Sequence, residues 1–406
     1  MTVAADEVAI VVLSEFQKLP AKRKPAIRDN GLHEWVPLSG IVAKGPDFLK
    51  CVALATGMKC LPASKLPQAN GVAIHDWHAE VLALRAFNRF LLDECKRLTF
   101  DSTFESDFLC RTSSSSSSVP PFTWRPEVSL HMYCSEAPCG DSSMELTMAS
   151  QTDSTPWSSP IPVSEQAEGQ LLGRGYFSQL GIVRRKPSRP DAPPTSSKSC
   201  SDKIALKQCT SLLSSLTSLL VSPENLYLSS LILPESQYSE TGCTRCYGFE
   251  PPGRMSCLTT NPPAWENGYK PVPFSIETTQ HEFDYSRRAV TAISEKISPS
   301  NLAVCWTYNK EVEEGIIGGV LQGRKAFDFK GASAVSRKKM WALALEVAEG
   351  VYGPEGQVTR ELKMGTYDEV KEKSVLLQAR RRVKNEVRRE ALKSWVRNTG
   401  DRGFSL

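Results

Sequence analysis

Apolar residues at helical spacing mark the longest predicted helix of the chain. They recur every three or four positions on one helix face, as Val81, Leu84, Phe87 and Leu91. This pattern predicts a helix whose first turn carries His78 and Glu80 and which ends near Lys96. The two polar side chains would therefore be held in fixed positions at the start of a rigid element.

Shorter apolar patterns predict a sheet and a first helix. Residues 1–17 have the periodicity of a helix, and two strands follow at Trp35–Val42 and Phe48–Thr56. The Gly45-Pro46 pair between these strands is typical of a hairpin turn. A further strand is predicted at Val128–Cys134, so the first third of the chain alternates between strands and helices.

The remaining helices are predicted from capping residues and periodicity. Asp141 opens one helix, and Ser201 and Asp202 are suitable N-caps for the next. The apolar face of a C-terminal helix consists of Leu376, Ala379, Val383, Val387, Ala391 and Trp395. Together these elements predict an α/β fold with a central mixed sheet, helices on both faces and C-terminal helices added to it.

Two segments interrupt this pattern. Residues 109–121 include six consecutive serines and a Pro-Pro pair, and residues 150–198 are also rich in Ser and Pro. Such compositions do not support a packed core, so we expect surface insertions or irregular loops. With these exceptions, residues 1–406 are expected to form a single domain.

Composition narrows the class of protein. Of the 406 residues, 40% are hydrophobic and 23% are charged, as in globular proteins. No secretory signal and no apolar run near the roughly 20 residues of a membrane helix are apparent. We therefore expect an intracellular protein of the nucleus or cytoplasm, neither secreted nor in a membrane. Its 12 cysteines are then expected to be thiols or metal ligands.

Positive charge is concentrated near the C-terminus. The net charge is only +4, but residues 371–390 contain eight Lys or Arg against three Asp or Glu. This segment is either a solvated helix face or the binding surface for an anion.

Candidate chemistry centres on the His78-x-Glu80 pair. An imidazole that binds zinc and a nearby carboxylate that moves protons are what a zinc-activated water requires. A bare pair of this kind is common by chance, so further ligands decide the matter. Cys139 follows a predicted strand between Pro138 and Gly140, and Cys200 lies at a helix N-terminus, where a thiolate is favoured. Without a third ligand, Cys139 would be read as a buried structural thiol.

Three motifs in order carry a family resemblance. They are His78-Ala79-Glu80, Pro138-Cys139-Gly140-Asp141 and Ser199-Cys200-Ser201-Asp202-Lys203. The chain resembles the adenosine deaminases that act on RNA, from about residue 14 to the C-terminus. Residues 57–62 and 184–189 are most similar to the tRNA-specific branch, and no separate RNA-binding domain is visible. Trp77 departs from that branch, which commonly has a small residue there. A cytidine deaminase is disfavoured because Ser142 replaces the second cysteine of P-C-x-x-C.

The resemblance implies a cytidine-deaminase-like fold and a function. His78, Cys139 and Cys200 would bind zinc, and Glu80 would be the catalytic proton shuttle for attack of water on C6 of adenine. The expected reaction converts adenosine to inosine in tRNA, at position 37 beside the anticodon of tRNA-Ala. Alternatives are deamination of double-stranded RNA and a catalytically inactive RNA-binding subunit; retention of Glu80 argues against the second. No obligate protein partner is evident.

The resemblance also implies a buried inositol hexakisphosphate around which the C-terminal helices are built. The positions that match its binding residues are Lys59, Lys203, Arg337, Tyr367, Lys371, Arg381 and Trp395. Asp76 and Lys203 would relay hydrogen bonds between this polyanion and the metal. The alternative is that these basic residues are scattered over the surface.

Two basic runs are candidate RNA contacts. They comprise Lys22, Arg23, Lys24, Arg184, Arg185, Lys186 and Arg189.

Three other features have weaker interpretations. A second zinc site would consist of Cys243, Cys246 and Cys257 with His281. The glycines of residues 315–323 favour a β-turn over a phosphate loop. His75 is a less suitable metal ligand than His78, which has the correct spacing to Glu80.

Overall fold

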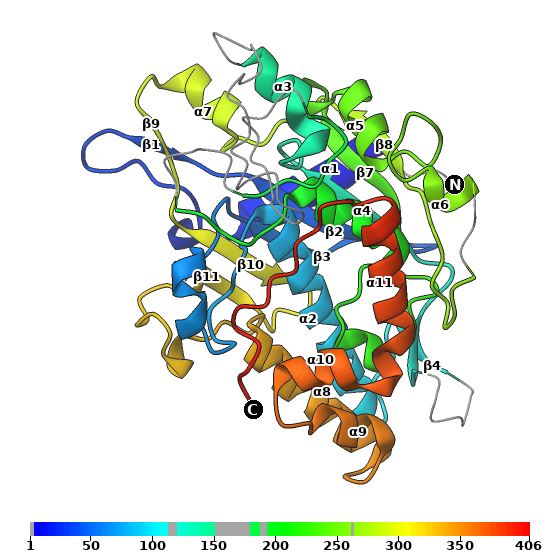
Figure 1. Cartoon of the computed structure of the whole chain (residues 1–406). Helices are drawn as coiled ribbons and strands as arrows, with labels where there is room; N and C mark the ends of the chain where they lie inside the picture. Colours follow the sequence, from blue (N-terminus) through cyan, green and yellow to red (C-terminus); the bar gives the residue numbers. More distant parts are fainter. Residues whose placement is uncertain (1–3, 113–119, 151–178, 187–192, 261–263) are drawn as a thin grey trace.

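An eight-stranded mixed sheet forms the centre of the computed structural model, which describes residues 4–112, 120–150, 179–186, 193–260 and 264–406 (Figure 1). The strand order is β12-β11-β10-β3-β2-β6-β7-β8. The β6–β7 and β7–β8 pairs are parallel, and the other pairs are antiparallel. The strands are β2 (Leu38–Lys44), β3 (Leu49–Thr56), β6 (Ser129–Cys134), β7 (Leu228–Pro234), β8 (Ser275–Thr279), β10 (Ala303–Thr307), β11 (Glu313–Ile317) and β12 (Val320–Leu321).

Two small sheets lie outside this centre. One pairs β1 (His33–Trp35) with β9 (Ile297–Pro299) in parallel, and the other pairs β4 (Leu109–Arg111) with β5 (Phe122–Trp124). The helices are α1 (Ala5–Lys18), α2 (Ala79–Phe100), α3 (Met144–Ala149), α4 (Cys200–Thr210), α5 (Glu240–Tyr247), α6 (Cys257–Thr260), α7 (Arg287–Ile293), α8 (Arg337–Tyr352), α9 (Gln357–Leu362), α10 (Tyr367–Lys373) and α11 (Gln378–Glu390).

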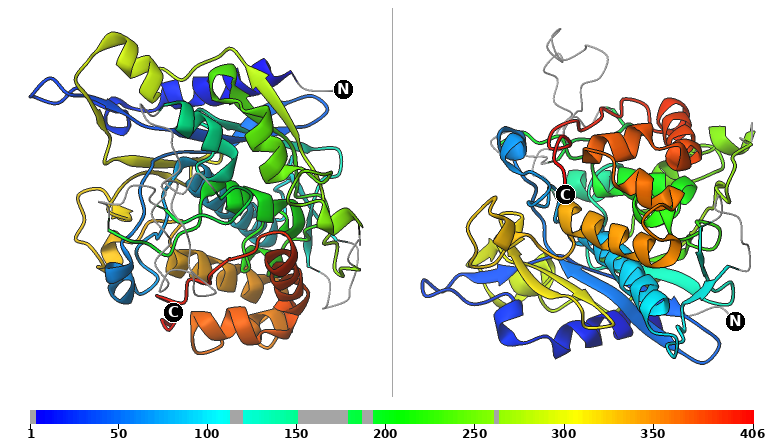
Figure 2. Two further views of the ribbon diagram at one scale, coloured as in Figure 1. Left: turned by 45° about the horizontal axis from the view of Figure 1, so that its top comes forward. Right: turned by 90° about the horizontal axis from the view of Figure 1, so that it is seen from below.

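Alternating side chains of β3 pack against helices on the two faces of the sheet. Leu54 belongs to a buried cluster with Val12 of α1, whereas Ala53 and Ala55 belong to a second cluster with Phe87 of α2. Successive residues of a strand point to opposite faces, so α1 and α2 cover opposite sides of the sheet (Figure 2). The predicted mixed α/β fold with helices on both faces is therefore confirmed, as are the C-terminal helices α8–α11. No helix in the described ranges has the length and apolar character needed to cross a membrane.

Proline and serine account for two differences from the sequence prediction. The strand predicted at Trp35–Val42 is divided at Pro37, which lacks an amide donor, so β1 and β2 join different sheets. The N-cap of α4 is Ser199, whose hydroxyl accepts a hydrogen bond from the Asp202 amide at 3.1 Å, rather than Ser201 or Asp202. The start of α4 at Cys200 nevertheless agrees with the prediction.

The first Ser-rich segment is shorter than predicted. Its first three residues form β4, which pairs with β5 just after the segment; Leu109 pairs with Trp124 and both side chains are buried. Residues 113–119 lie outside the described residues, as do 151–178 and 187–192 of the second segment. Among the glycines of residues 315–323, Gly318 and Gly319 lie in the β11–β12 turn and have positive φ, as the β-turn interpretation requires, whereas Gly315 lies within β11 and Gly323 follows β12.

Candidate active site

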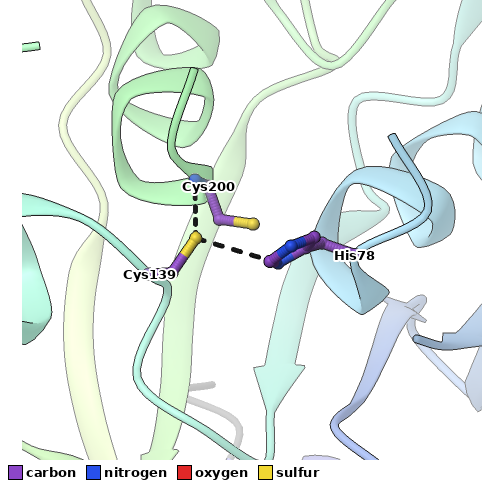
Figure 3. A group of neighbouring side chains, drawn as sticks. All are labelled: His78, Cys139 and Cys200. Atoms are coloured by element: carbon purple, nitrogen blue, oxygen red, sulfur yellow. Dashed lines mark hydrogen bonds between the residues drawn. The ribbon is translucent and has the colours of Figure 1, made fainter. Parts of the chain in front are cut away.

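Three side chains from separate segments converge between the starts of α2 and α4 (Figure 3). His78 is the N-cap of α2, Cys139 lies in the loop after β6, and Cys200 is the first residue of α4. Their ligand atoms all lie within 4.8 Å of one another, and the Cys139 Sγ is 3.8 Å from His78 Nδ1. One imidazole and two thiolates suit zinc and leave a fourth position for water or substrate. The structure thus brings together all three predicted metal ligands.

Backbone contacts fix the position of Cys139 against α4. Its Sγ accepts a hydrogen bond from the Cys200 amide at 3.4 Å, and its carbonyl accepts one from the Ser201 amide at 3.1 Å. Gly140 has φ +116°, and a Cβ there would lie 2.3 Å from Ser199 Oγ. Only glycine permits this approach of the two segments. Gly140 is therefore required for packing beside the candidate ligand Cys139.

The electrostatics of the site favour a thiolate. A hydrogen bond from the Cys200 thiol lowers the pKa of Cys139 well below its ordinary value, against the effect of burial. A thiolate is the form of cysteine that binds a metal ion. Burial, and then the hydrogen bond with Cys139, raises the pKa of Cys200 well above its ordinary value, so Cys139 is the thiolate of the pair.

Glu80 lies in the first turn of α2 and is buried, with 6% of its surface exposed. Burial and then the charge of Cys139 raise the pKa of its carboxyl group. A carboxylate with a raised pKa is suited to accept and return a proton near neutral pH. The predicted helix therefore places Glu80 two residues from the ligand His78, in an environment suited to proton transfer.

Lys186, one of the predicted RNA contacts, is buried beside Cys200 and lines the cavity that contains His78. Its ammonium group is buried and donates hydrogen bonds to Asp76 Oδ2 at 2.9 Å and to Cys200 Sγ at 3.0 Å. Burial lowers the pKa of Lys186, but the charges of Asp76, Cys139 and Cys200 raise it well above its ordinary value. Lys186 therefore remains charged, and its charge favours the thiolate forms of Cys139 and Cys200. Arg184 is also completely buried, beside Asp141, and is not a surface contact.

The remaining sequence candidates take other positions. His75 Nε2 pairs with Asp401 at 2.7 Å, away from the ligand group of His78. Trp77 packs in the core near Gly319. Among the described residues, the second group with ligand spacing is Cys60, Asp76 and His78, and no group with ligand spacing includes Cys243 or Cys246. The second zinc site is therefore not formed.

A cavity of about 330 Å³, the basic cavity, is lined by Asp76 and by many Lys and Arg side chains. Described residues lining it include eleven Lys and Arg but only two carboxylates, Asp76 and Glu372. Burial, followed by the charges of Arg337 and Arg402, lowers the pKa of Lys371 to about 7. Burial also lowers the pKa of Lys198 to about 7 and that of Lys384 well below its ordinary value. Such crowding of cations is unfavourable without an anion between them.

Most of the residues predicted to bind the polyanion meet at the basic cavity. Its lining includes Lys203, Arg337, Lys371, Arg381 and Trp395. The Tyr367 ring adjoins it, 5.8 Å from the Arg337 guanidinium carbon and 5.4 Å from Lys371 Nζ. Lys59 lies elsewhere, in the cavity that contains His78. Lys203 also donates to Asp76, so the predicted pair is in contact and connects the basic cavity with Lys186.

Sequence reasoning missed several cations of the basic cavity. Arg380, Lys384 and Arg388 line it from α11. Their spacing of four places them on one helix face, which was the available signal. Lys198 and Arg402 offered no comparable pattern, because they come from separate loops.

The other basic candidates differ in exposure. Lys22 is exposed, and Arg185 is partly exposed and lines the cavity that contains His78. Arg23 and Lys24 are partly buried and donate to the carbonyls of Glu313 at 3.1 Å and of Gln17 at 2.7 Å. Arg189 lies outside the described residues.

Comparison with known proteins agrees with this geometry. Residues 53–399 match the adenosine-deaminase (editase) domain. The tRNA-specific adenosine deaminase 1 of Schizosaccharomyces pombe is 35% identical over 399 residues, which cover 97% of this chain and 95% of that protein. Its Saccharomyces cerevisiae counterpart is 33% identical over 52% of this chain and 54% of that protein. The double-stranded RNA-specific editase Adar of Drosophila melanogaster is 28% identical over 68% of this chain and 41% of that protein.

Proposed function

The chain belongs to the adenosine-deaminase (editase) domain family, and from that membership we propose that it deaminates adenosine to inosine in tRNA, at position 37 of tRNA-Ala. The observation that carries the proposal is the ligand group His78, Cys139 and Cys200 beside the buried carboxylate of Glu80. Similarity to a tRNA-specific deaminase over 97% of the chain supports tRNA as the substrate. Ligands at the starts of α2 and α4 also support a cytidine-deaminase-like relationship.

The proposed chemistry divides roles between the metal and the chain. When bound, zinc would lower the pKa of a water molecule and so supply a nucleophile for C6 of adenine. His78, Cys139 and Cys200 would bind the ion. Glu80 would accept the proton of the attacking water, deliver it to the ring nitrogen and then assist the departure of ammonia.

A comparison of substrates tests this function. Purified protein is incubated with unmodified tRNA-Ala and, separately, with a long RNA duplex, and inosine is measured in both. We expect inosine in the tRNA, because an anticodon-loop adenosine is already largely unpaired and is cheaper to extrude than a base-paired one. Inosine in the duplex alone would instead assign the chain to double-stranded RNA.

The surface cations Lys22 and Arg185 are proposed to contact tRNA phosphates; Arg185 lines the cavity that contains His78. We expect the double variant Lys22→Ala, Arg185→Ala to bind tRNA less tightly and with a smaller dependence on salt. Each lost phosphate contact lowers the slope of log K against log salt by about 0.7 on single-stranded RNA. Fluorescence anisotropy at several salt concentrations measures the slope. Lys18→Ala is the control, since Lys18 is exposed and pairs with Glu15. An unchanged slope in the double variant would place both cations in the solvated surface.

The basic cavity is proposed to hold inositol hexakisphosphate. Its buried Lys and Arg side chains need counter-charge, and a compact polyanion supplies several negative charges within one small volume. Lys203 and Asp76, joined by Lys186 to Cys200, would carry hydrogen bonds from this anion to the metal ligands.

Denaturing the purified protein is expected to release inositol hexakisphosphate, which chromatography with phosphate analysis detects. The stability of anion-free protein gives a second measurement. The pKa of Lys371 in the folded chain, about 7, lies below the ordinary lysine value of about 10.4. Anion-free protein should therefore lose stability as the pH falls from about 10 to 7, and added inositol hexakisphosphate should reduce that loss. Absence of released phosphate, with no stabilisation by the added compound, would contradict the assignment.

A further inference from the structure

One wall of the cavity that contains His78 comes from a part of the fold that supplies no metal ligand. This cavity, of about 850 Å³, is lined by His78 and Cys139 and also by Trp35, Ile297 and Pro299. The last three residues belong to the small β1–β9 sheet, in which Trp35 is paired with Pro299. Figure 1 shows β1, β9 and α7 together at the margin of the molecule. A separate structural unit thus borders the site of the reaction.

The backbone of Trp35 is firmly held although its side chain is only partly buried. The Trp35 carbonyl accepts a hydrogen bond from the Ser300 amide at 2.9 Å, and the next amide, of Val36, donates to Tyr285 at 2.9 Å. The preceding residue, Glu34, accepts hydrogen bonds from Arg28 at 2.8 Å and from the Ser300 hydroxyl at 2.7 Å. Neither buried apolar cluster includes the Trp35 indole. The Trp35 ring thus extends from a firmly held backbone and lines the cavity that contains His78, a position more suited to binding than to packing.

Arg287 completes this wall. It is the first residue of α7, its side chain is exposed, and its guanidinium carbon lies 5.9 Å from the centroid of the Trp35 ring. Within the described ranges, no carboxylate forms an ion pair with Arg287. The adjacent Arg288, by contrast, pairs with Glu136 at 2.9 Å and with Glu282 at 2.6 Å. Arg287 therefore retains its charge and its hydrogen-bond donors for a ligand in the cavity.

We propose that Trp35 and Arg287 form a subsite for the nucleobase next to the target adenosine. Unstacked bases of single-stranded RNA bind on aromatic rings and on guanidinium planes, and Arg also pairs with the adjoining phosphate. In a duplex both faces of the neighbouring base are covered by stacking, so this subsite would favour a loop substrate. The inference rests on the proposed function, because it assumes that the target adenosine lies at the metal ligands.

Synthetic anticodon stem-loops test the subsite. Three substrates are compared: the intact loop and two loops in which the base 5′ or 3′ of the target is abasic. On the intact loop, Trp35→Ala should lower kcat/KM on the order of 10-fold, and Trp35→Phe should recover most of the loss. Phe329→Ala is the control, since Phe329 is likewise an aromatic ring near basic side chains but is exposed and lines a different cavity. On one of the abasic loops, wild type should fall to the level of Trp35→Ala, and the variant should lose nothing further.

Two results would overturn the subsite. The first is wild-type activity of Trp35→Ala on the intact loop. The second is an equal fractional loss on all three loops, because a merely structural role would not depend on the neighbouring base. If the wild type makes no inosine at all, the proposed function fails instead. The subsite is then tested by binding: Trp35→Ala must weaken affinity for the intact loop more than for one of the abasic loops, and equal weakening refutes it.

Discussion

Replacement of Glu80 by glutamine is expected to slow deamination by about 10²–10⁴-fold while the metal stays bound. The amide keeps the size of the carboxyl group but neither accepts nor returns a proton. Because Glu80 is not in the group of ligand atoms, its replacement removes no metal ligand. Single-turnover deamination of tRNA, with zinc measured by atomic emission in the same preparation, gives both quantities.

Glu94→Gln is the matched control for this variant. Glu94 is another buried carboxylate of α2, and it accepts a hydrogen bond from Ser106 at 2.5 Å on a later turn of the helix. Its substitution tests the effect of losing a buried charge from the same element. Near wild-type activity in Glu80→Gln, with zinc retained, would refute the role of Glu80 in proton transfer.

The second large effect is expected for Cys200→Ala, which should lose both the metal and the activity. Two ligands from the chain, His78 and Cys139, would remain, fewer than the three that catalytic zinc sites use. The change also leaves the buried ammonium of Lys186 without its sulfur acceptor at 3.0 Å. Zinc content after dialysis against a weak chelator, measured beside the deamination rate, tests this expectation. Cys139→Ala should behave in the same way.

Cys209→Ala is the control for loss of a buried thiol from α4. Cys209 lies on the same helix as Cys200, and its side chain is also buried, but it has no place in the ligand group. This variant should retain zinc. Full zinc occupancy in Cys200→Ala would exclude Cys200 from the metal site.

Local sequence signals and the family resemblance together predicted the candidate metal ligands and the helices that begin at them. The periodicity after Trp77 located α2 and therefore the positions of His78 and Glu80. Glycine at 140 is typical of a close approach between segments, and the capping residues near Cys200 indicated a helix start there, although the cap itself is Ser199 rather than Ser201 or Asp202. Such features are encoded within one or two turns of chain, so a single sequence reveals them.

Long-range pairing explains what the sequence did not reveal. Lys186 lies 110 residues from its partner Asp76, and nothing in the basic run of residues 184–189 distinguishes buried from exposed cations. The separation of β1 from β2 likewise depends on pairing with β9, more than 250 residues later. Charge and spacing predicted a concentration of cations near the C-terminus, but only the fold shows that many of them face inward around one cavity.

The most direct test of the central claim is to treat unmodified total tRNA with the purified chain and to map A-to-G changes in the cDNA. Catalysis by the site at His78, Cys139 and Cys200 predicts a new G at position 37 of tRNA-Ala. The change should be absent when Glu80→Gln protein replaces the wild type. Zinc-loaded wild-type protein that produces no such change in any tRNA would contradict the account.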